Sequence, residues 1–170
     1  MLLDAVEQLG ARYDYLLIDT QAGIGSEVMY FNTAATEIVC VINDEPTSLT
    51  DTYALIKILS RTYGEKSLSV IANNVPEEFI GKKSFTKLFR AAERFLHIDL
   101  KYLGHVPTDR MVPESIRSQR ALLELYPSSA AGLALATLGR RIDEDFFRCR
   151  LKGGMQFFFK QLLEMSAHGG

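Results

Sequence analysis

Short apolar runs alternate with amphipathic helical patterns along most of this sequence, and this alternation constrains the fold more than any other feature. We expect strands at 15–20, 37–43, 67–74 and 101–106. The run 37–43 (EIVCVIN) is almost continuously apolar and rich in Val and Ile. Continuous apolar strands separated by helices are typical of a parallel sheet that is covered on both faces. The pattern therefore predicts an α/β fold with a doubly wound, mainly parallel sheet and right-handed crossovers.

Helical patterns fill the segments between these strands. We expect helices at 2–9, 27–35, 50–63, 84–96, 113–125 and 130–142. Within 50–63, the spacing of Leu55, Ile58 and Leu59 predicts one buried face. Gly64 is a natural C-terminal cap for that helix. No internal linker is long enough to mark a second folded domain, so we assign 1–150 to one domain and 151–170 to a C-terminal tail.

Charge and cysteine usage exclude several classes of protein. A net charge of −2 gives no electrostatic case for direct nucleic-acid binding, which normally requires a basic patch. Cys40 lies in an apolar run, which favours a reduced core thiol over a disulfide or metal ligand. Asp4 and Glu7 interrupt the start of the chain, so it does not read as a signal peptide. We therefore expect a cytoplasmic protein.

Polar segments follow all four expected strands. In open parallel sheets, ligands bind beyond the carboxyl ends of the strands. The segments at these ends are Asp19-Thr20-Gln21-Ala22-Gly23, Asn43-Asp44-Glu45-Pro46, Asn73-Asn74 and Pro107-Thr108-Asp109. Because all four strand ends are polar, a ligand-binding edge of the sheet is favoured over a loop surface without a binding role.

The first of these segments carries the chemistry. An apolar strand that ends in a single aspartate is the usual form of a Walker B element, whose carboxylate holds the Mg²⁺ of a nucleotide. Gly23 can bring a backbone N–H close to a terminal phosphate because it lacks a Cβ. Taken alone, Asp19 could equally be a residue that caps the next turn.

Longer motifs narrow the choice of family. They are Asp19-Thr20-x-Ala22-Gly23-Ile24, the run Asp44-Glu45-Pro46-Thr47-Ser48-Leu49-Thr50-Asp51-Thr52-Tyr53-Ala54-Leu55-Ile56-Lys57, the segment Tyr102-Leu103-Gly104-x-Val106-Pro107 and Gln119-Arg120-x5-Tyr126-Pro127-Ser128-Ser129. Over 1–165 the chain resembles the MinD/ParA-type deviant P-loop ATPases, and within them the flagellar-number regulators. Gln21 stands where many members have proline. The resemblance implies a MinD-like P-loop NTPase fold that is incomplete at its N-terminal side, with 1–150 as a partial nucleotide-binding domain.

The resemblance also assigns roles to single residues. Asp19 and Gly23 match the catalytic Walker B aspartate and the switch glycine near the γ-phosphate, and Asp19 would hold Mg²⁺ through a water. The cofactor, ATP or ADP, would be bound by Asp19, Thr20, Asn73, Pro107, Thr108 and Asp109. Asn73 matches the residue that reads the adenine edge, whereas the residues alone would favour a turn at the end of a strand. Asn74 stands where several relatives have arginine.

A phosphate-binding loop is missing from this sequence. The family pattern is Lys-Gly-Gly-x-Gly-Lys-Thr, in which backbone N–H groups cradle the phosphates. Gly81-Lys82-Lys83-Ser84 and Lys152-Gly153-Gly154 do not match it, and neither follows an expected strand. We expect a truncated family member, although a natural variant without hydrolysis is the alternative. The sheet would then keep an unpaired apolar edge, so this polypeptide alone is expected to self-associate and to show no ATP turnover.

The tail at 155–165 (MQFFFKQLLEM) is amphipathic. Helical spacing places Met155, Phe158, Phe159 and Leu162 on one face, and Phe157 falls on the polar side. MinD-like proteins carry such a helix as a reversible membrane anchor, and aromatic side chains can dock to a lipid surface. The alternative is that this face packs onto its own domain or onto a partner.

By resemblance, the expected function is regulation of flagellar number and placement through ATP-dependent homodimerisation at the inner membrane surface. The implied partners are a signal-recognition-type GTPase, flagellar C-ring components or a flagellar transcription activator. The alternative is a catalytically inactive protein-interaction module on the same fold. A DNA-partitioning role is disfavoured by the acidic balance of charge.

Overall fold

The computed structural model describes residues 13–149. Residues 13–38 belong to one compact unit, and Val39–Arg148 form a second. The first unit holds α2 (Ser26–Ala34). The second unit holds β1 (Val39–Ile42), α3 (Pro46–Thr62), β2 (Ser67–Val75), α4 (Glu78–Phe95), β3 (Asp99–Pro107), α5 (Met111–Arg117), α6 (Leu122–Leu125) and α7 (Ala130–Cys149).

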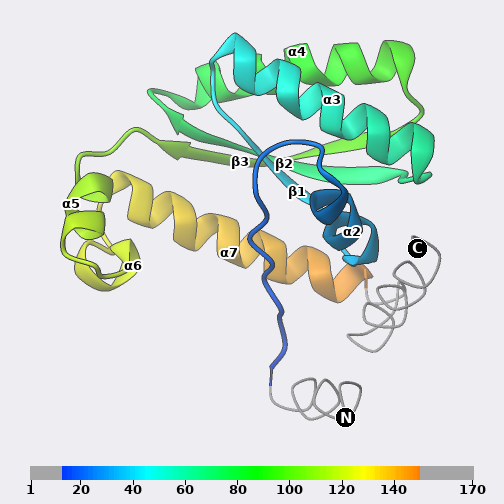
Figure 1. The fold of residues 1–170 in the computed structure, drawn as a ribbon. Helices are drawn as coiled ribbons and strands as arrows, with labels where there is room; N and C mark the ends of the chain where they lie inside the picture. The colour runs from blue at the N-terminus through cyan, green and yellow to red at the C-terminus, as the bar shows by residue number, and fades with distance from the viewer. Residues whose placement is uncertain (1–12, 150–170) are drawn as a thin grey trace. The chain divides into compact units, whose positions relative to one another are not determined.

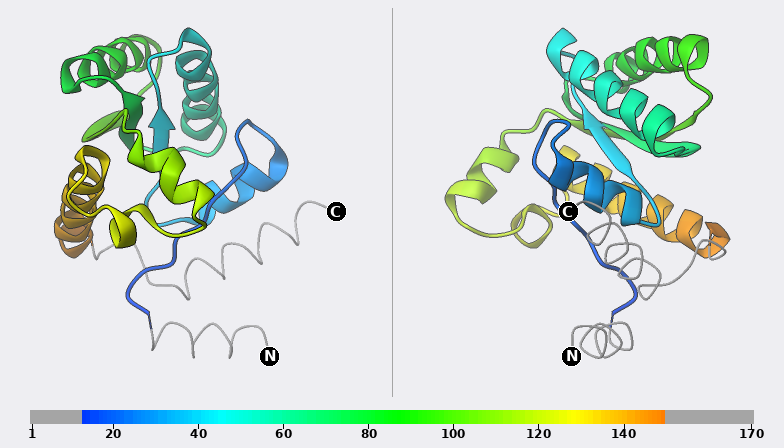
Figure 2. Two further views of the ribbon diagram at one scale, coloured as in Figure 1. Left: turned by 90° about the vertical axis from the view of Figure 1, so that its left-hand side faces the viewer. Right: turned by 45° about the vertical axis from the view of Figure 1, so that its right-hand side comes forward.

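The second unit is a layered α/β structure. Its strands form a parallel sheet in the order β1-β2-β3. Figure 1 shows α3 and α4 over one face of this sheet and α7 along the other, and Figure 2 shows the same layers from two further sides. The parallel, doubly wound α/β fold predicted from the alternating pattern is confirmed.

The core between the sheet and α3 and α4 is built from small and branched side chains. Val70 and Ala72 of β2 are fully buried, as are Ile56 and Leu59 of α3. On α4 the buried positions are Gly81, Ser84, Leu88 and Ala92, a spacing of three and four residues that forms one helical face. Helix α3 contacts both β1 and α4, and α4 contacts β2 and β3.

The predicted inner face of α3 was partly wrong. Leu59 is buried as expected, but Leu55 and Ile58 are only half-buried, and Ile56 takes the fully buried position. The physical reason is that α3 packs against two neighbours, β1 and α4, so its buried stripe lies between them. Helical spacing alone allowed either stripe.

A second core cluster lies between the sheet and α7. It comprises Leu103, Val106, Leu122, Ala131 and Leu138. Met111, Val112 and Tyr126 pack against it. This cluster joins α5, α6 and α7 to the strand that precedes them, which fixes the loop at the carboxyl end of β3.

The expected strand at 15–20 is not a strand in the structure. A strand requires a neighbour whose N–H and C=O groups complete its hydrogen bonds. Among residues 13–149 the sheet consists of β1, β2 and β3, and none of them pairs with 15–20. Leu16 and Leu17 are accordingly 51% and 89% exposed. The apolar pattern indicates that this segment is suited to be a strand. It does not determine whether a neighbouring strand is there to pair with it.

The expected helix at 113–125 is two helices, α5 and α6. Gln119 adopts a φ of 52°, in the left-handed region. The N–H of Gln119 donates to the carbonyl of Ile116 and that of Arg120 to Ser115, at 3.0 and 3.2 Å. This pair of hydrogen bonds is a Schellman motif, which ends α5 without a glycine. Helices α3, α4 and α7 are longer than the sequence predicted, because tertiary packing extends them beyond their most periodic segments.

Candidate functional site

The carboxyl end of β2 carries a bulge at Asn74. Asn73 pairs with Val106 and Val75 with Pro107, so Asn74 is an extra residue on β2. Its φ is 54°, a conformation that asparagine tolerates better than most residues. Asn73 and Asn74 are both exposed. The bulge therefore presents two adjacent amide side chains at the end of the sheet where ligands bind in this fold class.

The loop after β3 is held in place by hydrogen bonds from backbone N–H groups, most of them to the carboxylate of Asp109. The N–H of Thr108 donates to the carbonyl of Val75 at 2.9 Å. The two carboxylate oxygens of Asp109 accept from the N–H of Met111 at 2.9 Å and of Ala131 at 3.0 Å. The bond from Ala131, followed by that from Met111, lowers the pKa of Asp109. Asp109 thus joins the starts of α5 and α7, a structural role that sequence reasoning missed.

The loop after β1 is ordered by Asn43. The N–H of Glu45 donates to Asn43 Oδ1 at 3.0 Å, and the N–H of Asn43 donates to Ser48 Oγ at 3.2 Å. Helix α3 follows directly, with Pro46 in its first turn. The sequence contained a signal for this turn, because the side chain of an asparagine often accepts a hydrogen bond from the backbone N–H two residues later, which is an Asx-turn.

These three loops lie at one edge of the sheet because β1, β2 and β3 are parallel neighbours. The structure therefore brings together Asn73 and the segment Pro107-Thr108-Asp109, four of the predicted cofactor-binding residues. Their binding role stays a prediction. In the case of Asp109 it would have to coexist with the hydrogen bonds to Met111 and Ala131.

The other predicted site residues, Asp19, Thr20 and Gly23, lie in the first unit. Asp19 is exposed and Thr20 half-buried. Gly23 has a φ of 112°, and a Cβ built on it would meet no atom within 4 Å. Its requirement for glycine is therefore conformational. Gly25 precedes α2, and its carbonyl accepts the N–H of Met29 at 3.0 Å. These residues share one loop before α2, and their binding role stays a prediction.

The predictions about the C-terminal tail, metal sites and membrane spans concern residues outside these loops. Met155, Phe158, Phe159 and Leu162 lie outside the described residues. Across residues 13–149, no group of three or more His, Cys, Asp or Glu side chains could hold a metal ion. No helix in that range is long and apolar enough to cross a membrane.

Cys40 is a buried free thiol, as predicted, and burial raises its pKa to about 12.

Three relatives locate this parallel α/β domain among known proteins. It is 38% identical over 168 residues to the antiactivator FleN of Pseudomonas aeruginosa, covering 99% of this chain and 60% of FleN. It is 30% identical over 155 residues to the flagellum site-determining protein YlxH of Helicobacter pylori, covering 89% of this chain and 52% of YlxH. It is 28% identical over 149 residues to a putative septum site-determining protein MinD of Oltmannsiellopsis viridis, covering 86% of this chain and 45% of that protein.

The fold is a parallel α/β domain with polar loops at the carboxyl ends of its strands. The chain belongs to the MinD/ParA-type family, and its relative YlxH is by name a flagellum site-determining protein. It spans about half to three fifths of the length of these relatives. No family model matches the sequence.

Proposed function

We propose that this chain acts as a MinD-like, ATP-binding regulator of flagellar number or placement, and that it works by nucleotide-dependent dimerisation. The observation that carries the proposal is the likeness to FleN over 99% of the chain, together with that to a flagellum site-determining protein. A nucleotide switch of this class orders its loops when the γ-phosphate is bound and releases them after hydrolysis.

Within this proposal, each group of loops has a role. Asn73 reads the adenine edge, and Pro107, Thr108 and Asp109 form the wall beside the base. Asp19 holds Mg²⁺ through a water, Thr20 supports the same loop, and Gly23 places a backbone N–H near the γ-phosphate. The exposure of Asn73 and Asp19 and the positive φ of Gly23 are consistent with these roles. Flagellar partners, by the family resemblance, would be a signal-recognition-type GTPase, C-ring components or a flagellar transcription activator.

Nucleotide binding is expected to raise the melting temperature of the full 170-residue chain. A ligand at a hundredfold excess over Kd stabilises the folded state by about 2.7 kcal/mol. The measurement is a thermal shift titration with ATP and Mg²⁺ and with ADP. We expect Asn73→Ala to weaken the apparent affinity about tenfold, which corresponds to roughly one lost hydrogen bond.

Asn74→Gly is the matched control, because glycine keeps the left-handed backbone of the bulge and leaves Asn73 in place. Asp19→Ala should remove the magnesium dependence of the ATP response and leave the ADP response unchanged. An absence of any shift with either nucleotide would contradict the proposal and favour a catalytically inactive interaction module on the same fold.

Membrane association belongs to the same proposal, with the tail at 155–165 as a peripheral contact to the inner membrane. Phe158→Glu together with Phe159→Glu is expected to abolish flotation of the chain with phosphatidylglycerol-containing vesicles, because charges on the apolar face oppose burial in lipid. Phe157→Glu, on the polar side of the same expected helix, should float like the parent chain. Unchanged flotation of the double variant would exclude the tail as the membrane contact.

A further inference from the structure

The outer edge of β3 is a place where a strand of another chain could pair with this sheet. β3 is the last strand in the order β1-β2-β3, and no strand among residues 13–149 pairs with its outer side. An open strand edge is a ready template for another strand. At nine residues, β3 is long enough to form such a pair.

The regular backbone of β3 is interrupted at Leu103 and Gly104. Val70 of β2 pairs with Tyr102 and Ile71 with Gly104, so Leu103 is an extra residue on β3. Gly104 has a φ of 147°, which disfavours any residue with a side chain. A bulge of this kind twists the edge and removes part of the ladder that a second strand would need.

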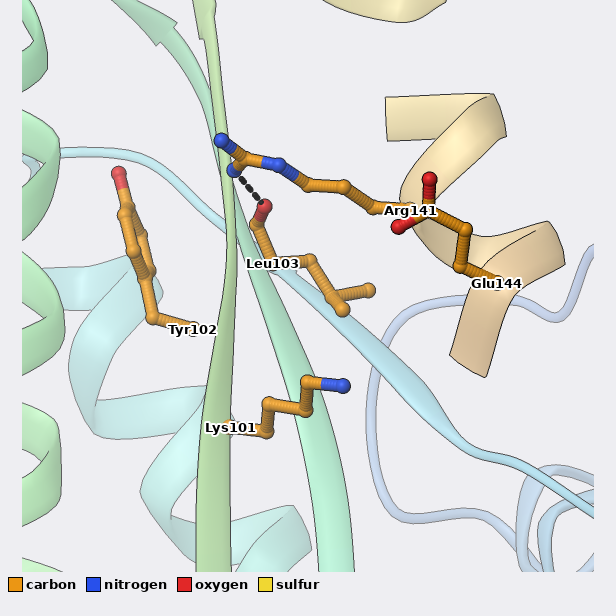
Figure 3. Close-up of a pocket in the computed structure, with 5 residues that line it drawn as sticks. All are labelled: Lys101, Tyr102, Leu103, Arg141 and Glu144. Carbon is orange, nitrogen blue, oxygen red and sulfur yellow. Dashed lines mark hydrogen bonds between the residues drawn. The ribbon is translucent and has the colours of Figure 1, made fainter. Parts of the chain in front are cut away.

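Arg141 reaches this bulge from α7. Its Nη1 donates a hydrogen bond to the carbonyl of Leu103 (Figure 3). A Cβ on Gly104 would lie 3.0 Å from Nη1 and 3.0 Å from a methyl carbon of Leu138. The missing side chain at Gly104 therefore makes room for the guanidinium beside the strand. Arg141 also lines, with Lys101, Tyr102, Leu103 and Glu144, a shallow cavity of about 230 Å³.

The charge of Arg141 also reaches the opposite face of the sheet. In Figure 3, Tyr102 points to the side of β3 away from Leu103. A hydrogen bond from Lys82 is the main cause that lowers the pKa of Glu78 on α4, and Arg141 lowers it further. Burial raises the pKa of Tyr102, and Arg141 opposes that change. Figure 3 shows the guanidinium of Arg141 beside β3, with Leu103 on one side of the strand and Tyr102 on the other.

We propose that Arg141 closes the outer edge of β3, and that without it this edge pairs with β3 of a second copy of the chain. The contact to Leu103 occupies a carbonyl on the edge strand, and the guanidinium adds a cation that an incoming strand would have to bury or displace. A second β3 is the matching occupant, because two identical edges have the same length and can pair about a two-fold axis.

The test is sedimentation velocity on the full chain over a concentration series without nucleotide. We expect Arg141→Ala to raise the association constant by about tenfold or more over the parent chain, a change of roughly 1.4 kcal/mol. Arg141→Lys keeps the positive charge but loses the several donors of the guanidinium. Its association constant should therefore lie between those of the parent chain and Arg141→Ala. This second variant also serves if Arg141→Ala does not fold.

Arg140→Ala is the matched control. Arg140 is the neighbouring arginine on α7, and it donates to Thr137 of its own helix. It should sediment like the parent chain. Hydrogen exchange identifies the contact: the backbone amides of residues 99–106 should exchange more slowly in the associated Arg141 variant. Unchanged association, or association in which these amides exchange faster, would overturn the proposal. Because no nucleotide is present, this result is separate from nucleotide-dependent dimerisation.

Discussion

Gly132→Ala is expected to destabilise the second unit by about 3 kcal/mol, the upper part of the usual range for overpacking. Gly132 lies in the first turn of α7 and is buried. A Cβ there would lie 2.5 Å from the carbonyl oxygen of Tyr126 and 2.9 Å from that of Pro127. These are backbone atoms of the loop after α6, so they cannot rotate away as a side chain does. Urea unfolding followed by circular dichroism measures the loss.

Gly139→Ala provides the control on the same helix. A Cβ at Gly139 meets no atom within 4 Å, and the residue is exposed. Alanine is the better helix former, so this variant should gain about 0.5–1 kcal/mol. Equal stability changes in the two glycine variants would contradict the close approach of α7 to the loop at Tyr126–Pro127.

Ile56→Ala is expected to cost about 2–5 kcal/mol, because it removes apolar surface from the core and leaves a cavity that the neighbouring elements fill only in part. Ile56 is 0% exposed on α3. The measurement is again urea unfolding, with the slope of the transition compared between variants to detect changes in the unfolded state.

Leu55→Ala distinguishes the structure from the face that the sequence predicted. Leu55 is only half-buried, so its truncation should cost about 1–2 kcal/mol. If Leu55→Ala proved more damaging than Ile56→Ala, the stripe of α3 predicted from periodicity would be right and the packing between β1 and α4 wrong.

Much of the fold could be predicted because its signals are local. The Val- and Ile-rich run at 37–43 predicted β1, and the core thiol at Cys40 followed from the same run. Bounds were less predictable: α4 begins at Glu78, six residues before the expected start, because its first turn packs Gly81 against Ala72 and Tyr102. Contacts of that kind depend on residues distant in sequence.

The candidate site shows the same division. The sequence alone identified Asn73 and the segment Pro107-Thr108-Asp109 as strand-end residues, since polar residues end apolar strands. It could not show that Asp109 accepts the N–H of Ala131, which is 22 residues away. Nor could it show that Asn74 is the bulge residue, because a register shift is a property of two paired strands.

The sequence by itself determined the class of this protein: a parallel α/β domain whose strands end in polar loops, with the motifs of the MinD/ParA-type family. Apolar periodicity and turn residues are enough for that, because each acts within a few neighbouring positions. Only the tertiary structure decided which side chains are fully buried on α3, that the run 15–20 pairs with none of the strands within residues 13–149, and that Arg141 of α7 donates to the carbonyl of Leu103 on β3. Each of these depends on pairing or packing between distant segments, whose geometry a single sequence does not record.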